Sequence, residues 1–488
     1  MSTSIVKCRT QAQITPLGVD CETPMFSWQM AASRTGAKQS AYRIIVSKDK
    51  TMTPIIWDSN IVKSYIQHTA LTADCTKLEP STRYYWKVFV WDEENMMHES
   101  EVTWFETGLM GKDASVWNNA QWIGSPKQTT NTACLYSYQM NVDFKTDIGN
   151  KAGIVLSARN KDNYVLFDVD MDNRTLMIYE YCDNAWDGST KEGHIPTVTI
   201  LGSKVGYIIS KDAVSEGLEH DWNKISITVN NRELSVSINN VTIIQKEADL
   251  MPNAGFFVPR RGCLFSIGFK QLGSTAYYDN LVISDPKTNT VFQNESFSDE
   301  SGIFSVLGSC NDGILTVKNQ FELACPVPAI NLLGTFHANP SKKIASARLY
   351  ATARGSYRVK VNGIDADGSF FAPGFTDYRL RIFYQTYDVT NLLHEGENQL
   401  LATVGKGYYN GYCGYSGPMK YGEQNSFMGR MIVTYTDGSK DELVTDNSWL
   451  FTDKGAVVDS DYLDGENYDA RLLPKDLSHI DNSDKCWK

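Results

Sequence analysis

The chain has 488 residues, enough for about three domains, with a net charge of -11 and 42% hydrophobic residues. The acidic balance argues against nucleic acids and anionic membranes as main partners, because phosphate binding needs clustered Lys and Arg. No segment approaches the roughly 18 apolar residues of a membrane span, and the N-terminus lacks a signal-like apolar run. The ten cysteines are scattered singly, so we expect reduced thiols in a cytoplasmic protein.

Residues 1–125 predict a small β-sandwich. The stretches AYRIIVS (41–47) and RYYWKVFVWD (83–92) alternate apolar and polar residues, the period of half-buried strands. We expect Tyr84, Trp86, Val88 and Val90 to share one face and Trp28 to pack from the opposite sheet, as in fibronectin type III-like domains.

Residues 126–325 predict a second sandwich, inserted ahead of the third domain and similar to concanavalin-like or laminin G-like jelly rolls. AGIVLSARNKDNYVLFDVD reads as strand, turn and strand, and Asn239-Asn240 marks a hairpin turn. The turn residues Asp162, Asn163, Asp170 and Asp172 could hold calcium, although such residues more often only form turns. A spacer or packing role is the alternative.

Residues 326–488 predict a third sandwich of the galactose-binding-like jelly-roll type, so the expected fold is all-β with three sandwich or jelly-roll domains. Asn362-Gly363 and the TDGS stretch (436–439) are hairpin signals, and DVTNLLHEGEN (388–398) predicts a one-turn helix followed by a Gly turn. The loops APGFTDYRLR and GKGYYNGYCGYSGPMKYGEQN are dense in Tyr, Asp, Asn and Gly, the residue types that a sugar-binding surface needs.

Motifs in all but the inserted part resemble bacterial α-L-rhamnosidases. The opening module carries PLGVDCETPMFSW, STRYYWKVFVWD, WFETG and WNNAQWIG, and the third domain carries APGFTDYRLRIFYQTYDVT, GKGYYNG, YTDGS and YLDGENYDAR. Family members commonly have Trp where this chain has Phe375 and Tyr408. The resemblance implies a rhamnose-binding third domain, with calcium bridging sugar and protein in some relatives.

A deoxyhexose offers a C–H face that stacks on aromatic rings and hydroxyls that bind amides and carboxylates. We therefore predict carbohydrate binding by Asp377, Tyr378, Tyr408, Tyr409, Asn410, Glu423, Gln424 and Asn425, and Asp377 is also the candidate calcium ligand. Each residue has a structural alternative: Asp377 can cap its turn, and the tyrosines can alternate between core and solvent. Asp388 reads as the start of a helical turn, and Asp464, Glu466 and Arg471 as interdomain contacts.

α-L-Rhamnosidases use two carboxyl groups roughly 6.5–9.5 Å apart, and in the family these lie in an (α/α)6 helical barrel that follows the β modules. No run of amphipathic helices predicts such a barrel here. We therefore expect a truncated chain, the non-catalytic, L-rhamnose-binding front part of a rhamnosidase, whose catalytic domain acts in cis or in trans. Two alternatives stay open: a β-sandwich glycoside hydrolase with an unrecognised carboxylate pair, for which Asp168 and Asp170 are a weak candidate, and a protein-interaction scaffold.

Overall fold

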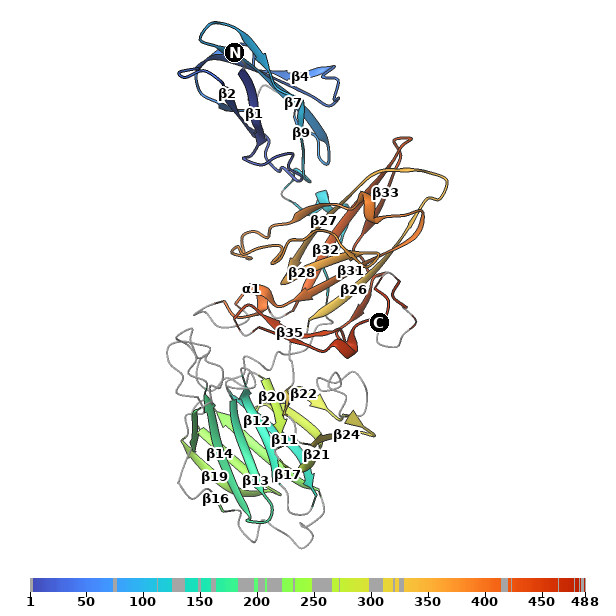
Figure 1. The fold of residues 1–488 in the computed structure, drawn as a ribbon. Coiled ribbons are helices and arrows are strands. Elements are labelled where there is room, and N and C mark those ends of the chain that lie inside the picture. The colour runs from blue at the N-terminus through green and yellow to red at the C-terminus, as the bar shows by residue number, and fades with distance from the viewer. Residues whose placement is uncertain are drawn as a thin grey trace.

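The computed structural model describes residues 3–72, 77–111, 113–124, 137–147, 151–158, 164–182, 197–200, 207–208, 222–230, 233–247, 266–271, 273–297, 310–318, 321–323, 329–413, 420–422, 424–463, 465–477, 479–481, 483 and 487. These residues form three β-sandwiches, and the third lies between the first and the inserted one (Figure 1). The all-β prediction is confirmed. None of the helices in the described part of the chain combines the length and apolarity that a bilayer crossing requires.

The first sandwich packs a three-stranded sheet on a six-stranded one. The small sheet runs β1 (Thr3–Thr10), β2 (Met25–Ala32), β6 (His68–Ala70); the larger runs β4 (Ile55–Asp58), β3 (Gln39–Ser47), β7 (Arg83–Asp92), β8 (Met97–Glu99), with β5 (Val62–Lys63) on β3 and β9 (Thr103–Glu106) on β7.

The predicted core of this sandwich is confirmed. Strand β7 alternates strictly, and Tyr84, Trp86, Val88 and Val90 are buried on one face. Trp28 packs into the same core from β2 in the other sheet. Its indole Nε1 donates a hydrogen bond to Gln39 (2.9 Å), so the buried donor is satisfied.

The inserted sandwich is the largest of the three. One sheet runs β19 (Val241–Glu247), β18 (Glu233–Ile238), β17 (Asn223–Asn230), β11 (Ser137–Thr146), β21 (Thr275–Ser284), β24 (Ile314–Lys318), β23 (Cys310–Asn311), with β22 (Val291–Glu295) on β21. The other runs β15 (Thr197–Ile200), β14 (Thr175–Cys182), β13 (Tyr164–Asp170), β12 (Lys151–Ala158), β20 (Ser266–Lys270), β25 (Phe321–Leu323), with β16 (Tyr207–Ile208) on β14.

A continuous apolar core fills the space between these two sheets, with Phe144, Phe167, Ile227, Phe269 and Tyr278 among its fully buried members. The predicted Asn239-Asn240 turn is confirmed: both residues have positive φ (50° and 67°) and join β18 to β19. Tight two-residue hairpins require this conformation, and Asn tolerates it well.

The third sandwich carries the candidate site. One sheet runs β10 (Ile123–Gly124), β32 (Ser426–Tyr435), β27 (Ile344–Arg354), β30 (Gln385–Asp388), with β33 (Lys440–Val444) on β32; the other runs β29 (Ile364–Asp365), β28 (Ser356–Val361), β31 (Gly396–Gly405), β26 (Ile330–Ala338), β34 (Leu450–Thr452). A hairpin of β35 (Val457–Asp461) and β36 (Gly465–Tyr468) follows.

Short helices mark the connections of this sandwich: the 3-10 turns η1 (Ala114–Trp117), η6 (Thr390–Leu392) and η8 (Ala470–Leu472), and the single-turn α1 (Gly407–Asn410). The predicted Asn362-Gly363 turn is confirmed by positive φ at both residues (49° and 80°). The predicted one-turn helix is η6, where Asp388 Oδ1 accepts from the Thr390 backbone N–H (3.1 Å), the structural role expected of Asp388.

The third sandwich is assembled from both sides of the insertion. Strand β10, which precedes the inserted sandwich in sequence, pairs with β32, so that Ile123 lies opposite Phe427. Trp117 of η1 also packs on this domain, against Tyr384. The chain therefore leaves the third sandwich after β10, forms the inserted sandwich, and then returns to complete the third sandwich.

Candidate carbohydrate site

A loop between β29 and β30 presents the first aromatic side chains of the candidate site. Its backbone is fixed by Tyr357, whose N–H donates to Ala372 O (2.9 Å), and by Gln385, whose side-chain amide donates to Pro373 O (3.0 Å). Phe375 is about half exposed (53%) because the loop holds it outside the sandwich core. Hydrogen bonds to strands β28 and β30 thus hold the part of the loop that precedes the Phe375 ring.

Helix α1 presents the second group of rings. It begins at Gly407, which has a φ of +52°, and a Cβ there would lie 2.8 Å from the Ser356 backbone nitrogen. Glycine is the residue that fits this tight, left-handed entry. The turn that follows carries Tyr408 and Tyr409, just after the end of β31.

The two groups meet in a cluster of six aromatic rings that we call the aromatic cluster. Its ring centroids lie 4.6–6.4 Å apart, mostly edge to face, the arrangement that ring quadrupoles favour. The members are Phe375, Tyr378, Tyr408, Tyr409, Tyr421 and Tyr462. Three of the predicted binding residues, Tyr378, Tyr408 and Tyr409, are therefore brought together in one cluster.

The hydroxyl groups of two cluster members, Tyr378 and Tyr462, stay protonated at neutral pH. Burial, with smaller contributions from Tyr462 and Tyr421, raises the pKa of Tyr378 well above its usual range, and burial also raises the pKa of Tyr462. The phenol of Tyr378 donates to Gly374 O (3.2 Å). These rings are therefore neutral groups that combine an apolar face with a hydrogen-bonding edge.

Asp377 lies beside the cluster and is engaged by its own loop. Both of its carboxylate oxygens accept hydrogen bonds from the Arg379 guanidinium (2.9 and 2.6 Å), and Oδ1 also accepts from the Arg379 backbone N–H (3.1 Å). The hydrogen bond with the Arg379 side chain lowers the pKa of Asp377 to about 2. The carboxylate is fully charged at neutral pH, and a cation would share it with Arg379.

The remaining predicted binding residues, three amides and one carboxylate, differ in their surroundings. Asn410 is fully buried, and its side chain has no hydrogen-bond partner among the described residues. Asn425 is also buried, and its Nδ2 donates to Val404 O (3.2 Å), which ties the incoming β32 to β31. Gln424 is half-buried, whereas Glu423 lies outside the described residues.

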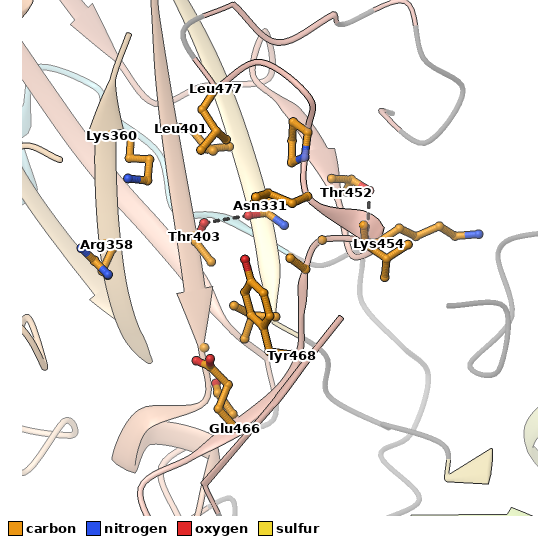
Figure 2. A pocket seen from close by; sticks show the side chains of 18 of the residues that line it. Asn331, Arg358, Lys360, Leu401, Thr403, Thr452, Lys454, Glu466, Tyr468 and Leu477 are labelled. Carbon is orange, nitrogen blue, oxygen red and sulfur yellow. Dashed lines mark hydrogen bonds between the residues drawn. The ribbon is translucent and has the colours of Figure 1, made fainter. Parts of the chain in front are cut away.

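A groove that our reading of the sequence missed adjoins the aromatic cluster. It has a volume of about 1280 Å³ and lies between the outer face of the β28–β31–β26 sheet and the C-terminal segment (Figure 2). Gly407 and Tyr462 line it, which makes the groove continuous with the cluster. The only available signal was the alternation Ser356, Arg358, Lys360, which places three polar residues on the solvent face of one strand.

The predicted interdomain residues lie along this groove. Glu466 and Arg471 line it, and Arg471 forms an ion pair with Asp469 (2.5 Å) at the start of η8. Asp464 lies outside the described residues.

In the inserted sandwich, Asp168 and Asp170 share the outer face of β13. The Lys151 ammonium lies 3.4 Å from Asp168 and 3.3 Å from Asp170. Burial raises the pKa of Asp168. Burial acts in the same direction on Asp170, but hydrogen bonds from Asn173 and the Lys151 ammonium together lower the pKa of Asp170. Asp170 therefore forms a turn with Asn173, while Asp162 and Asn163 lie outside the described residues.

The residues that the structure describes contain no group of three or more His, Cys, Asp or Glu side chains arranged to hold a metal ion. Calcium also binds backbone carbonyls and amide oxygens, which the loops around Asp377 supply. Cys8, Cys21 and Cys413 carry free thiols.

Comparisons with known proteins cover nearly the whole chain. Residues 342–488 match the family described as "Alpha-L-rhamnosidase N-terminal domain", and residues 5–111 match "Rha78A-like, N-terminal immunoglobulin domain". An alpha-L-rhamnosidase of Streptomyces avermitilis is 31% identical over 480 residues, which are 97% of this chain and 43% of that protein. One from Formosa agariphila is 36% identical over 149 residues, 30% of this chain and 16% of that protein.

Solved structures agree on the fold. The crystal structure of the Streptomyces avermitilis alpha-L-rhamnosidase complexed with L-rhamnose superposes with a TM-score of 0.57 at 24% identity, covering 100% of this chain and 44% of that one. The alpha-L-rhamnosidase of Dictyoglumus thermophilum gives 0.52 at 20% identity, with 99% and 33% covered. The chain thus spans less than half the length of these relatives. Together the family matches identify the third β-sandwich as an α-L-rhamnosidase N-terminal domain and the first as a Rha78A-like N-terminal immunoglobulin domain.

Proposed function

We propose that this chain is the carbohydrate-recognition part of an α-L-rhamnosidase and that the aromatic cluster binds terminal L-rhamnose. The observation that carries the proposal is the convergence of Tyr378, Tyr408 and Tyr409 with the half-exposed Phe375. A 6-deoxyhexose has an apolar methyl group and C–H face that match such rings. The kinship with α-L-rhamnosidases, one of them solved with L-rhamnose, supports this sugar.

The buried amide of Asn410 supports the same site. A fully buried polar group without a partner costs about 1–3 kcal/mol, and proteins tend to keep such groups where function uses them. Asn410 belongs to the helical turn that carries Tyr408 and Tyr409. A small rearrangement of this turn on binding would expose a donor and an acceptor to sugar hydroxyls.

Binding alone is the activity that we propose for this chain. A monosaccharide site of this kind binds in the range of about 1 mM to 1 µM. Its benefit is to raise the local concentration of glycan near a catalytic domain, in the same chain or in a partner. The proposed calcium ligand is Asp377, whose carboxylate would bind the ion and Arg379 together.

Calorimetric titration with L-rhamnose, with calcium and with a chelator, tests the proposal. We expect saturable binding that weakens several-fold in Tyr408→Ala. Tyr65→Ala is the matched control, because Tyr65 is an exposed tyrosine (81%) of the first sandwich. No heat of binding, or equal binding by both variants, would overturn the proposed site.

Incubation with p-nitrophenyl α-L-rhamnoside tests the non-catalytic part of the proposal. We expect no release of nitrophenol above a buffer control. Release would favour the β-sandwich hydrolase instead, and loss of that release in Asp168→Asn would then assign the activity to the inserted sandwich.

A further inference from the structure

We infer that the groove beside the aromatic cluster binds an acidic oligosaccharide, with a sugar carboxylate held by Arg358. This inference extends the proposed function from one terminal sugar to the glycan that carries it. It depends on a feature that single strands do not reveal: the cross-strand rows of side chains on the outer face of the β28–β31–β26–β34 sheet (Figure 2).

One row on this face is polar from end to end. Arg358 lies opposite Thr403, Thr403 opposite Asn331, and Asn331 opposite Thr452. With neighbouring strands 4.7–4.9 Å apart, a row across four strands is about 14 Å long. A site of this length accommodates more than one sugar ring.

The next row on the same face is mostly apolar, and the C-terminal segment covers it. Leu401 and Leu333 lie opposite each other, and Ile480 buries them. Gln399 fastens the segment in both directions: its side chain donates to Ile480 O (3.0 Å) and accepts from Ile480 N (2.7 Å). The four residues of the polar row all line the groove.

The cationic end of the groove determines the charge of the ligand. Arg358 and Lys360, two residues apart on the same face, share the single carboxylate of Asp365 (2.8 and 3.1 Å). The Arg358 guanidinium also lies 5.1 Å from the ring centroid of Phe370, which is 64% exposed. This arrangement leaves one excess positive charge and a planar guanidinium fork suited to a carboxylate.

The rest of the groove suits neutral hydroxyl groups. Thr403 donates to Asn331 Oδ1 (2.7 Å), and the Asn331 Nδ2 has no partner among the described residues, so it can donate to a ligand. Across the groove, Glu466 accepts hydroxyl hydrogen bonds and Tyr468 offers a half-exposed ring (54%). The volume of about 1280 Å³ exceeds the roughly 300–1,000 Å³ of sites for single small molecules.

The overall charge of -11 does not oppose an anionic ligand at this place. At physiological ionic strength the Debye length is about 8 Å, so charges on the other sandwiches are largely screened. A ligand carboxylate at Arg358 experiences mainly the charges nearest to it, those of Arg358, Lys360 and Asp365. The acidic lining residues belong to the segments that face the sheet: Asp461, Glu466, Asp476 and Asp481. Uronic acids combine a carboxylate with ring hydroxyls in a single pyranose ring, so the class of ligand that we infer is a uronate-containing oligosaccharide.

Titration of the full chain with a trimer of galacturonic acid, beside a neutral galactose trimer, tests this inference. We expect the acidic trimer to bind more tightly, and to weaken as sodium chloride rises from 0.05 to 0.3 M. Arg358→Gln should weaken its binding about tenfold or more, as expected for a lost charge-assisted contact. Lys50→Gln, the same charge change at an exposed position of the first sandwich, should leave binding unchanged.

Two further variants separate this inference from the proposed function. Tyr408→Ala should weaken L-rhamnose binding and spare the acidic trimer, whereas Arg358→Gln should do the reverse. Thr403→Val, which removes a hydroxyl from the middle of the polar row, should weaken both trimers. Equal affinity for the two trimers, or no effect of Arg358→Gln, would overturn the inference even if L-rhamnose binds.

Discussion

The carboxylate of Glu106 in the first sandwich lies 2.5 Å from Nε and 3.1 Å from Nη2 of Arg348 in the third. Both side chains are buried (5% and 8% exposed), and Arg348 also pairs with Asp388 (2.8 Å). A second link runs from Tyr384, which donates to Asp20 and accepts from the Leu109 N–H (2.8 Å). The first and third sandwiches therefore meet through a specific polar joint, and the first holds the third in a fixed orientation.

Removing Glu106 leaves the buried Arg348 guanidinium with the half-exposed Asp388 as its remaining acidic partner. We expect Glu106→Ala to destabilise the joint by about 3 kcal/mol, because the Arg348 guanidinium then loses its main partner. Urea unfolding measures the loss of stability, and small-angle scattering measures the spread of interdomain distances, which should increase. Glu79→Ala is the control, because its pair with Lys48 is exposed and worth little. Equal effects of the two substitutions would contradict the fixed joint.

Asp92 makes the first sandwich sensitive to acid. Its buried carboxylate accepts from Arg34 (3.2 Å) and from the Met96 N–H (2.9 Å), and it contacts His98 Nε2 (2.9 Å). The contact with His98 contributes most to lowering its pKa to about 2. Because the folded-state pKa lies below the unfolded one, the stabilisation is complete above about pH 4 and is lost as the pH falls towards 2.

Hydrogen exchange of the β7 and β8 amides between pH 2 and pH 7 measures this effect. We expect Asp92→Asn to lower protection at neutral pH, and the difference from the unaltered chain to shrink as the pH falls below about 4. Glu94→Gln, an exposed neighbour, should follow the unaltered chain throughout. A constant difference across the pH range would show that the negative charge of Asp92 does not contribute to the stability of the sandwich.

The sequence predicted features that depend on neighbours along the chain. The alternation from Arg83 to Asp92 predicted the core face of β7, and Asn362-Gly363 predicted a hairpin, because each signal is local. The meeting of Tyr378 with Tyr409 was predictable only through resemblance. The polar row from Arg358 to Thr452 was not predictable, because it depends on the register of four strands, which no local pattern specifies.

The proposed calcium dependence rests on the carboxylate of Asp377. If Asp377 binds the ion as proposed, Arg379 competes for the same oxygens. We therefore expect Arg379→Gln to tighten calcium binding, and Asp377→Asn to abolish the effect of calcium on L-rhamnose affinity. Calorimetry with calcium alone and then with sugar measures both. Arg381→Gln is the matched control, because that guanidinium lies over Phe383 (5.1 Å) instead. Unchanged calcium binding in Asp377→Asn would place the ion elsewhere.

Gly334 tests the packing beneath the groove sheet. It lies in β26, and a Cβ at this position would be 2.5 Å from the ring of Trp449, which closes the core of the third sandwich. Because the indole is held by its Nε1 hydrogen bond to Val444 O (3.0 Å), it cannot move away freely. We expect Gly334→Ala to cost about 1–3 kcal/mol, as overpacking does.

Hydrogen exchange of the β26 and β31 amides localises this loss to the third sandwich. Gly368→Ala is the matched control: no atom lies within 4 Å of the added methyl group, so protection should stay unchanged. If Gly334→Ala is as stable as Gly368→Ala, the Trp449 side chain has room to shift, and the sheet that forms the floor of the groove is less rigid than its packing indicates. In that case the polar row would also be free to adjust, and Arg358→Gln would weaken binding of the acidic trimer by less than tenfold.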